Sequence, residues 1–321
     1  MKKTAYVLLC LILLCVLSGC GDSASNSDGK LSIVATVFPE YDWTKQLLGS
    51  EINNVELTLL LDNGVDLHSF QPSVQDMVTI SECDLLIYVG GVSDKWIDDA
   101  LANAAGKKPI AINLLNVLGE SAKEEELVEG MQTDEAEEPD GDVEYDEHVW
   151  LSLRNASLFC EAITNALCSL DPIKKAAYEA NLDTYLESLS ALDNDYQEMT
   201  DAARANTVLF ADRFPFRYLT DDYGIDYYAA FVGCSAETEA SFETVAFLAE
   251  KLNMLELDAV LTIETGDDAL ANTIIDTAGR HDVRILKIDS MQAVTSEAIA
   301  AGADYLQIMR NNMEILRQAL Q

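Results

Sequence analysis

The run DLLIYVG at residues 84–90 holds five consecutive apolar side chains and shows no alternation of apolar and polar positions. Such a run is typical of a strand that is buried on both faces, as in a parallel sheet covered by helices. Seven further runs resemble it, three in the N-terminal half and four in the C-terminal half: LSIVAT (31–36), VELTLLL (55–61), PIAINLL (109–115), TVLFAD (207–212), IDYYAAF (225–231), DAVLTIE (258–264) and RILKIDS (284–290). Because helical or polar segments separate them, the sequence predicts two βα series.

A long helix is predicted between the two series, over residues 171–205. Asp171 can cap it, Pro172 suits its first position, and no glycine or proline follows within the segment. Two shorter helices with a break at residues 193–195 are the alternative. The fold class predicted is therefore α/β, with two Rossmann-like βα domains with parallel sheets joined by a single long spine helix. The N-terminal domain should span residues 32–170 and the C-terminal domain residues 206–321.

The first twenty residues, MKKTAYVLLCLILLCVLSGC, have a basic start, an apolar run and small residues before a cysteine. This pattern indicates a secretory signal peptide over residues 1–19. Leu17-Ser18-Gly19-Cys20 resembles a lipobox, in which Cys20 becomes the lipid anchor, and residues 20–31 would form a flexible tether. We therefore expect a protein anchored by lipid to the extracytoplasmic face of the cell membrane. An ordinary cleaved signal with an incidental cysteine is the alternative.

The chain carries 20 Lys and Arg against 56 Asp and Glu, a net charge of −36. Nucleic acid is excluded as a partner because phosphate binding needs clustered cations. Residues 120–147 contain 14 acidic side chains and one lysine, which predicts a mobile surface loop or, alternatively, a weak cation-collecting arm. After the signal and anchor, four cysteines remain, namely Cys83, Cys160, Cys168 and Cys234. None forms a CxxC pair, which argues against a thiolate zinc site and leaves disulfides or free thiols open.

Ligands of open α/β sheets bind at the carboxyl ends of the strands. Three polar residues lie at or after the end of a predicted strand: His68, Asp212 and Asp289. A fourth, His148, directly precedes the segment VWLSL. Two imidazoles and two carboxylates from both halves can meet only in the crevice between them, and this donor set suits Zn²⁺ or Mn²⁺. The sequence therefore predicts a metal site between the domains. Glu264 should lie nearby in a supporting role, whereas His281 precedes a strand and should be structural.

The same residues lie in motifs that resemble the metal-binding (zinc and manganese) lipoproteins of ABC importers, the ZnuA/TroA-like family. The motifs are the lipobox, GVDLHSFQPSVQD (64–76), DEHVWLS (146–152), the long helix and GADYLQIMRNNMEILRQAL (302–320). The resemblance covers essentially the whole mature chain. It implies that His68, His148 and Asp289 are metal ligands, and that Trp150 packs behind His148.

The family has a fourth metal ligand, a histidine or a glutamate, and this chain has neither residue at the corresponding position. Aligned from the strand VLFAD the position falls on Asp212, and aligned back from FRYLTDDYG it falls on Arg213, because the loop DRFPFRY (212–218) is one residue longer than usual. An arginine cannot bind a cation, so Asp212 is the preferred fourth ligand. Glu237 and Glu239 are the alternatives.

The resemblance implies a binding protein, not an enzyme, that captures a divalent cation and delivers it to an ABC permease. Zn²⁺ is slightly favoured over Mn²⁺, and a monomer is expected. Capture needs deprotonated imidazoles, so affinity should fall as the pH drops through about 6.5. Three alternatives stay open: an exported metallohydrolase, for which the chain has no HExxH motif, a surface adhesin, and a binding protein of the same architecture for an organic or anionic ligand with Arg213 as counter-ion.

Overall fold

The computed structural model describes residues 30–102, 108–132, 144–235 and 239–321. The chain divides into two units, Met1–Lys30 and Leu31–Gln321, and all that follows concerns the second. The predicted signal peptide, Cys20, nearly all of the tether and Glu237 lie outside the described residues. Within the described ranges, none of the helices combines the length and apolar character needed to cross a bilayer.

The N-terminal lobe, residues 31–170, is built on a parallel sheet with the strand order β2-β1-β3-β4. These strands are β1 (Leu31–Ala35), β2 (Val55–Leu59), β3 (Leu85–Tyr88) and β4 (Ile110–Asn113). The helices of the lobe are α2 (Phe38–Leu48), α3 (Val74–Glu82), α4 (Lys95–Ala102), α5 (Leu114–Leu118) and α6 (Leu153–Leu170). The run DLLIYVG supplies β3, an interior strand with all four residues buried, as predicted from its unbroken apolar character.

The C-terminal lobe, residues 207–321, holds a second parallel sheet with the order β6-β5-β7-β8. Its strands are β5 (Thr207–Phe214), β6 (Asp226–Val232), β7 (Ala259–Ile263) and β8 (Arg284–Ile288). The helices of this half of the chain are α8 (Arg217–Tyr223), α9 (Phe242–Met254), α10 (Ala269–Ala278), α11 (Ser296–Ala300) and α12 (Tyr305–Ala319). Of these, α11 lies beside the N-terminal lobe, where Ser296 N donates to Asp62 O. All eight predicted strands are present, so the predicted α/β fold with two parallel sheets is confirmed.

The pairing of β5 with β6 is irregular near the carboxyl end of β5. Phe210 pairs with Ala229 and Arg213 pairs with Phe231, so two residues of β5 oppose one residue of β6. Such a bulge changes the direction of the side chains that follow it. The bulge lies at Ala211 and Asp212, next to the position for which the sequence left two alignments open.

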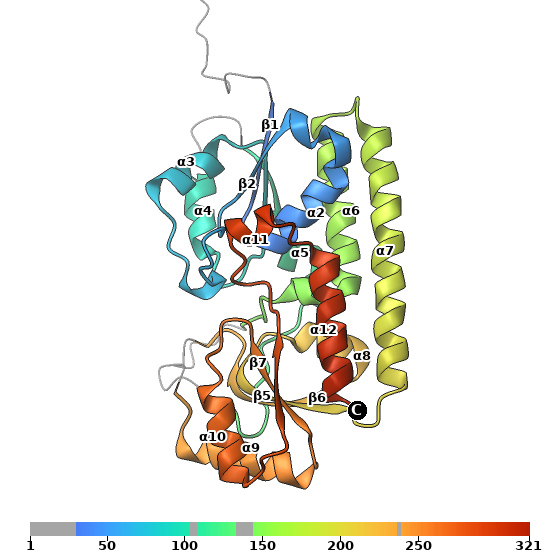
Figure 1. The fold of residues 1–321 in the computed structure, drawn as a ribbon. Helices are drawn as coiled ribbons and strands as arrows, with labels where there is room; N and C mark the ends of the chain where they lie inside the picture. Colours follow the sequence, from blue (N-terminus) through green and yellow to red (C-terminus); the bar gives the residue numbers. More distant parts are fainter. Residues whose placement is uncertain (1–29, 103–107, 133–143, 236–238) are drawn as a thin grey trace, which may run out of the picture. The chain divides into compact units, whose positions relative to one another are not determined.

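Helix α7 (Lys175–Asp201) is one uninterrupted helix of 27 residues, as the preferred interpretation of the sequence predicts. It begins later than expected, because Asp171 ends α6 and accepts a hydrogen bond from Ile173 N in a turn. Figure 1 shows α7 running alongside both lobes, where it contacts α2, α6, α8 and α12. One apolar core continues from Ile33 in β1 through α7 to Met309 in α12, so the two lobes share buried surface.

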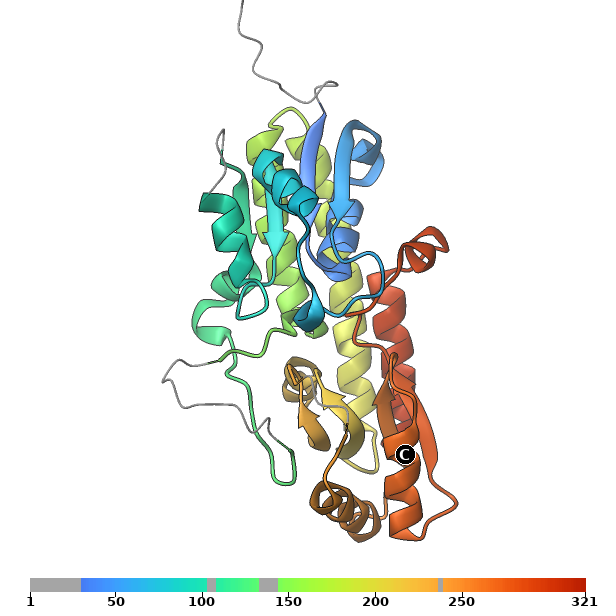
Figure 2. The ribbon, with the colours of Figure 1, turned by 90° about the vertical axis from the view of Figure 1, so that its left-hand side faces the viewer.

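The acidic segment does not behave as predicted where the structure describes it. Residues 122–132 lie against the C-terminal lobe (Figure 2): Gln132 N donates to Ala230 O of β6 at 2.9 Å, and Lys123 N donates to Tyr218 Oη of α8 at 2.9 Å. The prediction of a mobile surface loop is therefore wrong for this part, because backbone pairing and ion pairs compensate the self-repulsion. Residues 133–143 lie outside the described residues.

The structure decides between disulfides and free thiols for the four cysteines. All four cysteines of the described residues are free thiols: Cys83, Cys160, Cys168 and Cys234. Burial raises the pKa of the Cys83 thiol to about 12, which keeps this thiol protonated and chemically inert.

Candidate metal centre

His68 lies in a single turn of 3-10 helix, Leu67–Ser69, beyond the carboxyl end of β2. Asp66 caps this turn, since its Oδ1 accepts a hydrogen bond from His68 N at 2.9 Å. The ring atom Nδ1 lies 2.9 Å from Ser93 Oγ and 3.4 Å from Glu147 Oε2. A proton on Nδ1 would face the hydroxyl of Ser93 and the carboxylate of Glu147, and would leave the lone pair of Nε2 for a metal.

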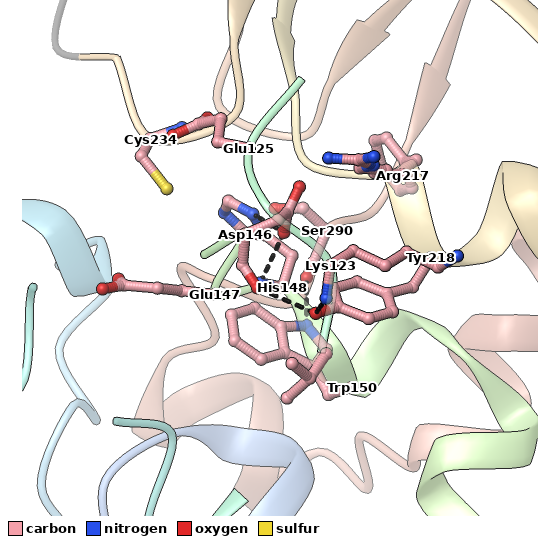
Figure 3. A network of polar contacts seen from close by, with 12 residues as sticks. Lys123, Glu125, Asp146, Glu147, His148, Trp150, Arg217, Tyr218, Cys234 and Ser290 are labelled. Atoms are coloured by element: carbon pink, nitrogen blue, oxygen red, sulfur yellow. Dashed lines mark hydrogen bonds and ion pairs between the residues drawn. The ribbon is translucent and has the colours of Figure 1, made fainter. Parts of the chain in front are cut away.

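His148 is completely buried immediately before the turn Val149–Leu151. Both its backbone N and its Nδ1 contact Asp146 Oδ1, at 2.8 and 2.9 Å. Trp150 packs against its ring at 5.4 Å between centroids, edge to face, as the sequence motif implied (Figure 3). A carboxylate on Nδ1 fixes the ring orientation and makes the opposite nitrogen a better metal ligand.

The Nε2 atoms of His68 and His148 face each other at 3.1 Å. Two nitrogens bound to one tetrahedral zinc ion at 2.0–2.1 Å would be separated by about 3.3 Å. The two rings are therefore already at the spacing that a shared ion requires. Each ring is also anchored at its other nitrogen, so this spacing is fixed by the fold rather than by the ion.

The two imidazoles differ in their affinity for a proton. Burial, together with the charge of His148, lowers the pKa of His68 to about 3. Burial acts in the same direction on His148, but the charge and the hydrogen bond of Asp146 outweigh it and raise the pKa of His148. With its amide nitrogen turned toward Asp66, Gln292 brings its oxygen 3.2 Å from His148 Nε2. Without a metal, His148 can carry a proton on Nε2, and this N–H can donate to His68 Nε2 and to the side-chain oxygen of Gln292. The proton then occupies the position that a cation would take.

Cys234 is the third potential ligand at this point. Its Sγ and the ring nitrogens of His68 and His148 all lie within 4.8 Å of one another, the one such group of three among the described residues. Cys234 follows β6, and its backbone N donates to Glu125 Oε1 at 3.1 Å. Cys234 is not part of a CxxC pair, so no cysteine motif in the sequence pointed to it. Its position beyond the carboxyl end of a strand, the criterion used for His68 and Asp289, would have found it.

The two predicted aspartates are not part of this group. Asp289 Oδ1 accepts a hydrogen bond from Met291 N at 2.8 Å, and burial raises the pKa of Asp289. Asp212 accepts hydrogen bonds from Arg213 N through Oδ1 and from Ile263 N through Oδ2, at 2.9 and 3.3 Å. The bulge in β5 thus turns Asp212 toward β7 instead of toward the imidazoles.

The remaining acidic candidates also lie elsewhere. Glu264 accepts hydrogen bonds from the backbone N and Oγ of Ser290, at 2.8 and 2.7 Å, so it supports the turn after β8, in the supporting role expected. Glu239 is exposed to solvent. Neither belongs to the group of ligand atoms around His68 and His148.

Arg213, the second alignment candidate, forms an ion pair across the two lobes. Its Nη2 lies 2.7 Å from Asp66 Oδ2, and both side chains are mostly buried. Asp66 therefore bonds simultaneously to Arg213 and to the turn that carries His68.

Comparisons with known proteins agree with this architecture. The family model described as ZnuA, zinc-uptake complex component A, periplasmic, matches residues 33–319. The zinc-binding lipoprotein AdcA of Streptococcus pneumoniae serotype 4 is 30% identical over 324 residues, which cover 99% of this chain and 61% of that protein. The chain thus spans about three fifths of the length of this relative.

Two further proteins match over nearly their whole length. The high-affinity zinc uptake system protein ZnuA of Bacillus subtilis is 26% identical, over 97% of this chain and 94% of its own. The crystal structure of the Zn(II)-bound ZnuA-like domain of S. pneumoniae AdcA superposes with a TM-score of 0.71 at 29% identity, covering 91% of this chain and 99% of that domain. With its two parallel sheets, its long α7 and the match over residues 33–319, the chain belongs to the ZnuA family of zinc-uptake components.

Proposed function

We propose that this protein captures Zn²⁺ between its two lobes and delivers it to an ABC permease, and that His68 and His148 are its first two ligands. The observation that carries the proposal is the 3.1 Å separation of their Nε2 atoms, with each Nδ1 held by a fixed partner. Imidazole nitrogens are preferred zinc ligands. The relatives named for zinc binding and zinc uptake support the same cargo.

Asp289 is proposed as the carboxylate that joins the ion when the lobes close around it. Support comes from the turn that follows Asp289, where Ser290 O accepts a hydrogen bond from Trp150 Nε1 at 2.9 Å. Trp150 is two residues from His148, so this bond connects the end of β8 to the imidazole pair. Displacement of Asp289 toward the imidazoles, with loss of its bond to Met291 N, would bring a negative charge to the cation.

The anionic-ligand alternative is disfavoured by Arg213. Its guanidinium is already paired with Asp66 at 2.7 Å, so the positive charge that an anion would need is compensated inside the protein. The S. pneumoniae AdcA domain that matches over 99% of its length is described as Zn(II)-bound. We therefore infer binding and release of a metal cation, without catalysis.

The location and the assembly state remain parts of the proposal. We propose that Cys20 carries the lipid and holds a monomer at the outer face of the membrane. Replacing Cys20 by alanine should release the protein into the medium, whereas Cys168→Ser should leave it in the membrane fraction. Retention of the Cys20→Ala variant in the membrane would refute the anchor but not the metal site.

The test of the metal site is Zn²⁺ titration of the full chain after dialysis against a chelator. The wild type should bind one equivalent. His68→Ala and His148→Ala should each lose more than about 100-fold in affinity, because loss of a direct ligand exceeds the 10–100-fold effect of a supporting residue. His281→Ala removes the chain's remaining histidine and is the matched control, expected to bind as the wild type does. Wild-type affinity in either ligand variant would refute the proposed site.

A further inference from the structure

The C-terminal lobe offers no conventional third ligand on β5. Of the two residues that align with the family position, Asp212 accepts backbone hydrogen bonds through both carboxylate oxygens. Arg213 carries a positive charge and is paired with Asp66. With His68, His148 and the proposed Asp289 as ligands, one position of a tetrahedral zinc ion stays unfilled. A donor from another element of the C-terminal lobe would complete the site.

We propose that Cys234 is this donor, so that the zinc ion is bound by two imidazoles and one thiolate. The inference rests on the proposed function, since it assigns a further ligand to the same site. The ligand atoms of Cys234, His68 and His148 lie within 4.8 Å of one another. In a tetrahedral site with Zn–N of 2.0–2.1 Å and Zn–S of 2.3 Å, a nitrogen and a sulfur are separated by about 3.6 Å. The largest of these separations thus exceeds the required distance by at most about 1.2 Å.

The turn that carries Cys234 is held close to His148 by specific contacts. A Cβ added to Gly233 would lie 2.9 Å from His148 Cε1 and 2.9 Å from Phe214 O, so only glycine allows this approach. Glu125 accepts the hydrogen bond of Cys234 N at 3.1 Å. Figure 3 shows Cys234 beside Glu125 with its thiol directed toward the interior of the network. These contacts fix the backbone of the turn beside His148.

Zinc binding at Cys234 would break its S–H bond, form one Zn–S bond and release the proton to solvent. With one thiolate and the carboxylate of Asp289, the dication would be formally neutral, which suits a site with little access to water. A thiolate is a soft ligand that favours zinc, whereas manganese prefers oxygen ligands. Cys234 would therefore make the site select Zn²⁺ over Mn²⁺. A site of two imidazoles and two carboxylates would discriminate only slightly between these two ions.

The test uses Co²⁺ as a spectroscopic substitute for zinc in the full chain under reducing conditions. The wild type should show an intense near-ultraviolet absorption from thiolate-to-cobalt charge transfer. Cys234→Ser should lose this band, lose at least about tenfold in Zn²⁺ affinity, in line with the sensitivity of metal sites to single groups, and bind Mn²⁺ no more weakly than the wild type. Cys168→Ser is the matched control, because this thiol lies next to Lys175 O in the α6–α7 connection, and it should retain both the band and the affinity.

The outcomes separate this inference from the proposed function. A wild type that binds Co²⁺ and Zn²⁺ stoichiometrically without the band refutes Cys234 as a ligand, while His68 and His148 stand. The same conclusion follows if Cys234→Ser keeps the wild-type zinc affinity and selectivity. A wild type that binds neither metal refutes the proposed function itself. X-ray absorption of the zinc-loaded protein gives an independent measurement, with a sulfur neighbour expected at about 2.3 Å.

Discussion

Replacing Glu40 by glutamine should stabilise the protein at neutral and alkaline pH. Glu40 is completely buried at the start of α2, where Oε2 accepts hydrogen bonds from Thr36 N and Val37 N at 2.8 and 3.2 Å. The other oxygen, Oε1, has no hydrogen-bond partner among the described residues. Burial, with the nearby charge of Asp94 adding to it, raises the pKa of Glu40 from 4.5 to about 8. The folded protein therefore holds a proton on Glu40 that the unfolded chain releases.

The direction of the pH effect follows from proton linkage. Between pH 4.5 and 8 the folded state binds more protons at Glu40 than the unfolded state, so the free energy of unfolding falls as the pH rises through this window. A shift of this size corresponds to a loss of about 3 kcal/mol between pH 5 and pH 8, as an order of magnitude. Glutamine keeps the shape and an acceptor oxygen but carries no charge, so Glu40→Gln should remove this part of the pH dependence.

The assay is urea denaturation of the metal-free protein at several pH values from 5 to 8. The difference in unfolding free energy between Glu40→Gln and the wild type should grow by about 3 kcal/mol in favour of the variant as the pH rises. Glu56→Gln, which changes an exposed carboxylate in β2, is the control and should run parallel to the wild type. If the curves of Glu40→Gln and the wild type are parallel over the whole range, then Glu40 is not protonated in the folded state and the reasoning fails.

Three further substitutions test the contacts around the imidazoles. Asp146→Asn keeps the size of the side chain but removes the charge that faces His148 Nδ1 at 2.9 Å, and Zn²⁺ calorimetry should show an affinity about 10–100-fold lower; an unchanged affinity would contradict the role given to Asp146. Arg213→Met leaves the mostly buried Asp66 without its ion-pair partner. Thermal denaturation should show that the free energy of unfolding falls by about 1–3 kcal/mol. An unchanged melting temperature would show that the ion pair contributes nothing to stability. Gly233→Ala would bring a methyl group to 2.9 Å from His148 Cε1, and zinc affinity should fall while far-ultraviolet circular dichroism stays that of the wild type; full affinity would mean that the turn can move away at no cost.

The interior strands β1, β3, β5 and β7 could be predicted from the sequence because they are mostly buried and therefore contain long apolar runs. The prediction of β3 from DLLIYVG and of β5 from TVLFAD needed no knowledge of the rest of the fold. The end of β5 was harder. Its last residues pair beyond a bulge, and a bulge depends on the partner strand rather than on local propensity.

The site could be predicted only in part, for a related reason. His68 and His148 are rare residues at changes of structural type, and the structure brings their Nε2 atoms to 3.1 Å. The direction in which Asp212 points is set by backbone donors of β7, which are distant in the sequence. Cys234 reaches the imidazoles because Glu125, more than one hundred positions earlier, holds its backbone. Contacts of this kind leave no local pattern in the sequence.

The hydrogen bond from Gln132 N to Ala230 O has a consequence for how copies of this protein meet. β6 is an outer strand of its sheet, and outer strands with unpaired backbone groups invite pairing with another molecule. Here the chain itself bonds to Ala230 O, and the segment that does so carries Glu125, Glu126 and Glu129. A second copy arriving at this edge would find the acceptor Ala230 O already bonded within its own chain, so the segment protects this part of the sheet edge from pairing with another molecule.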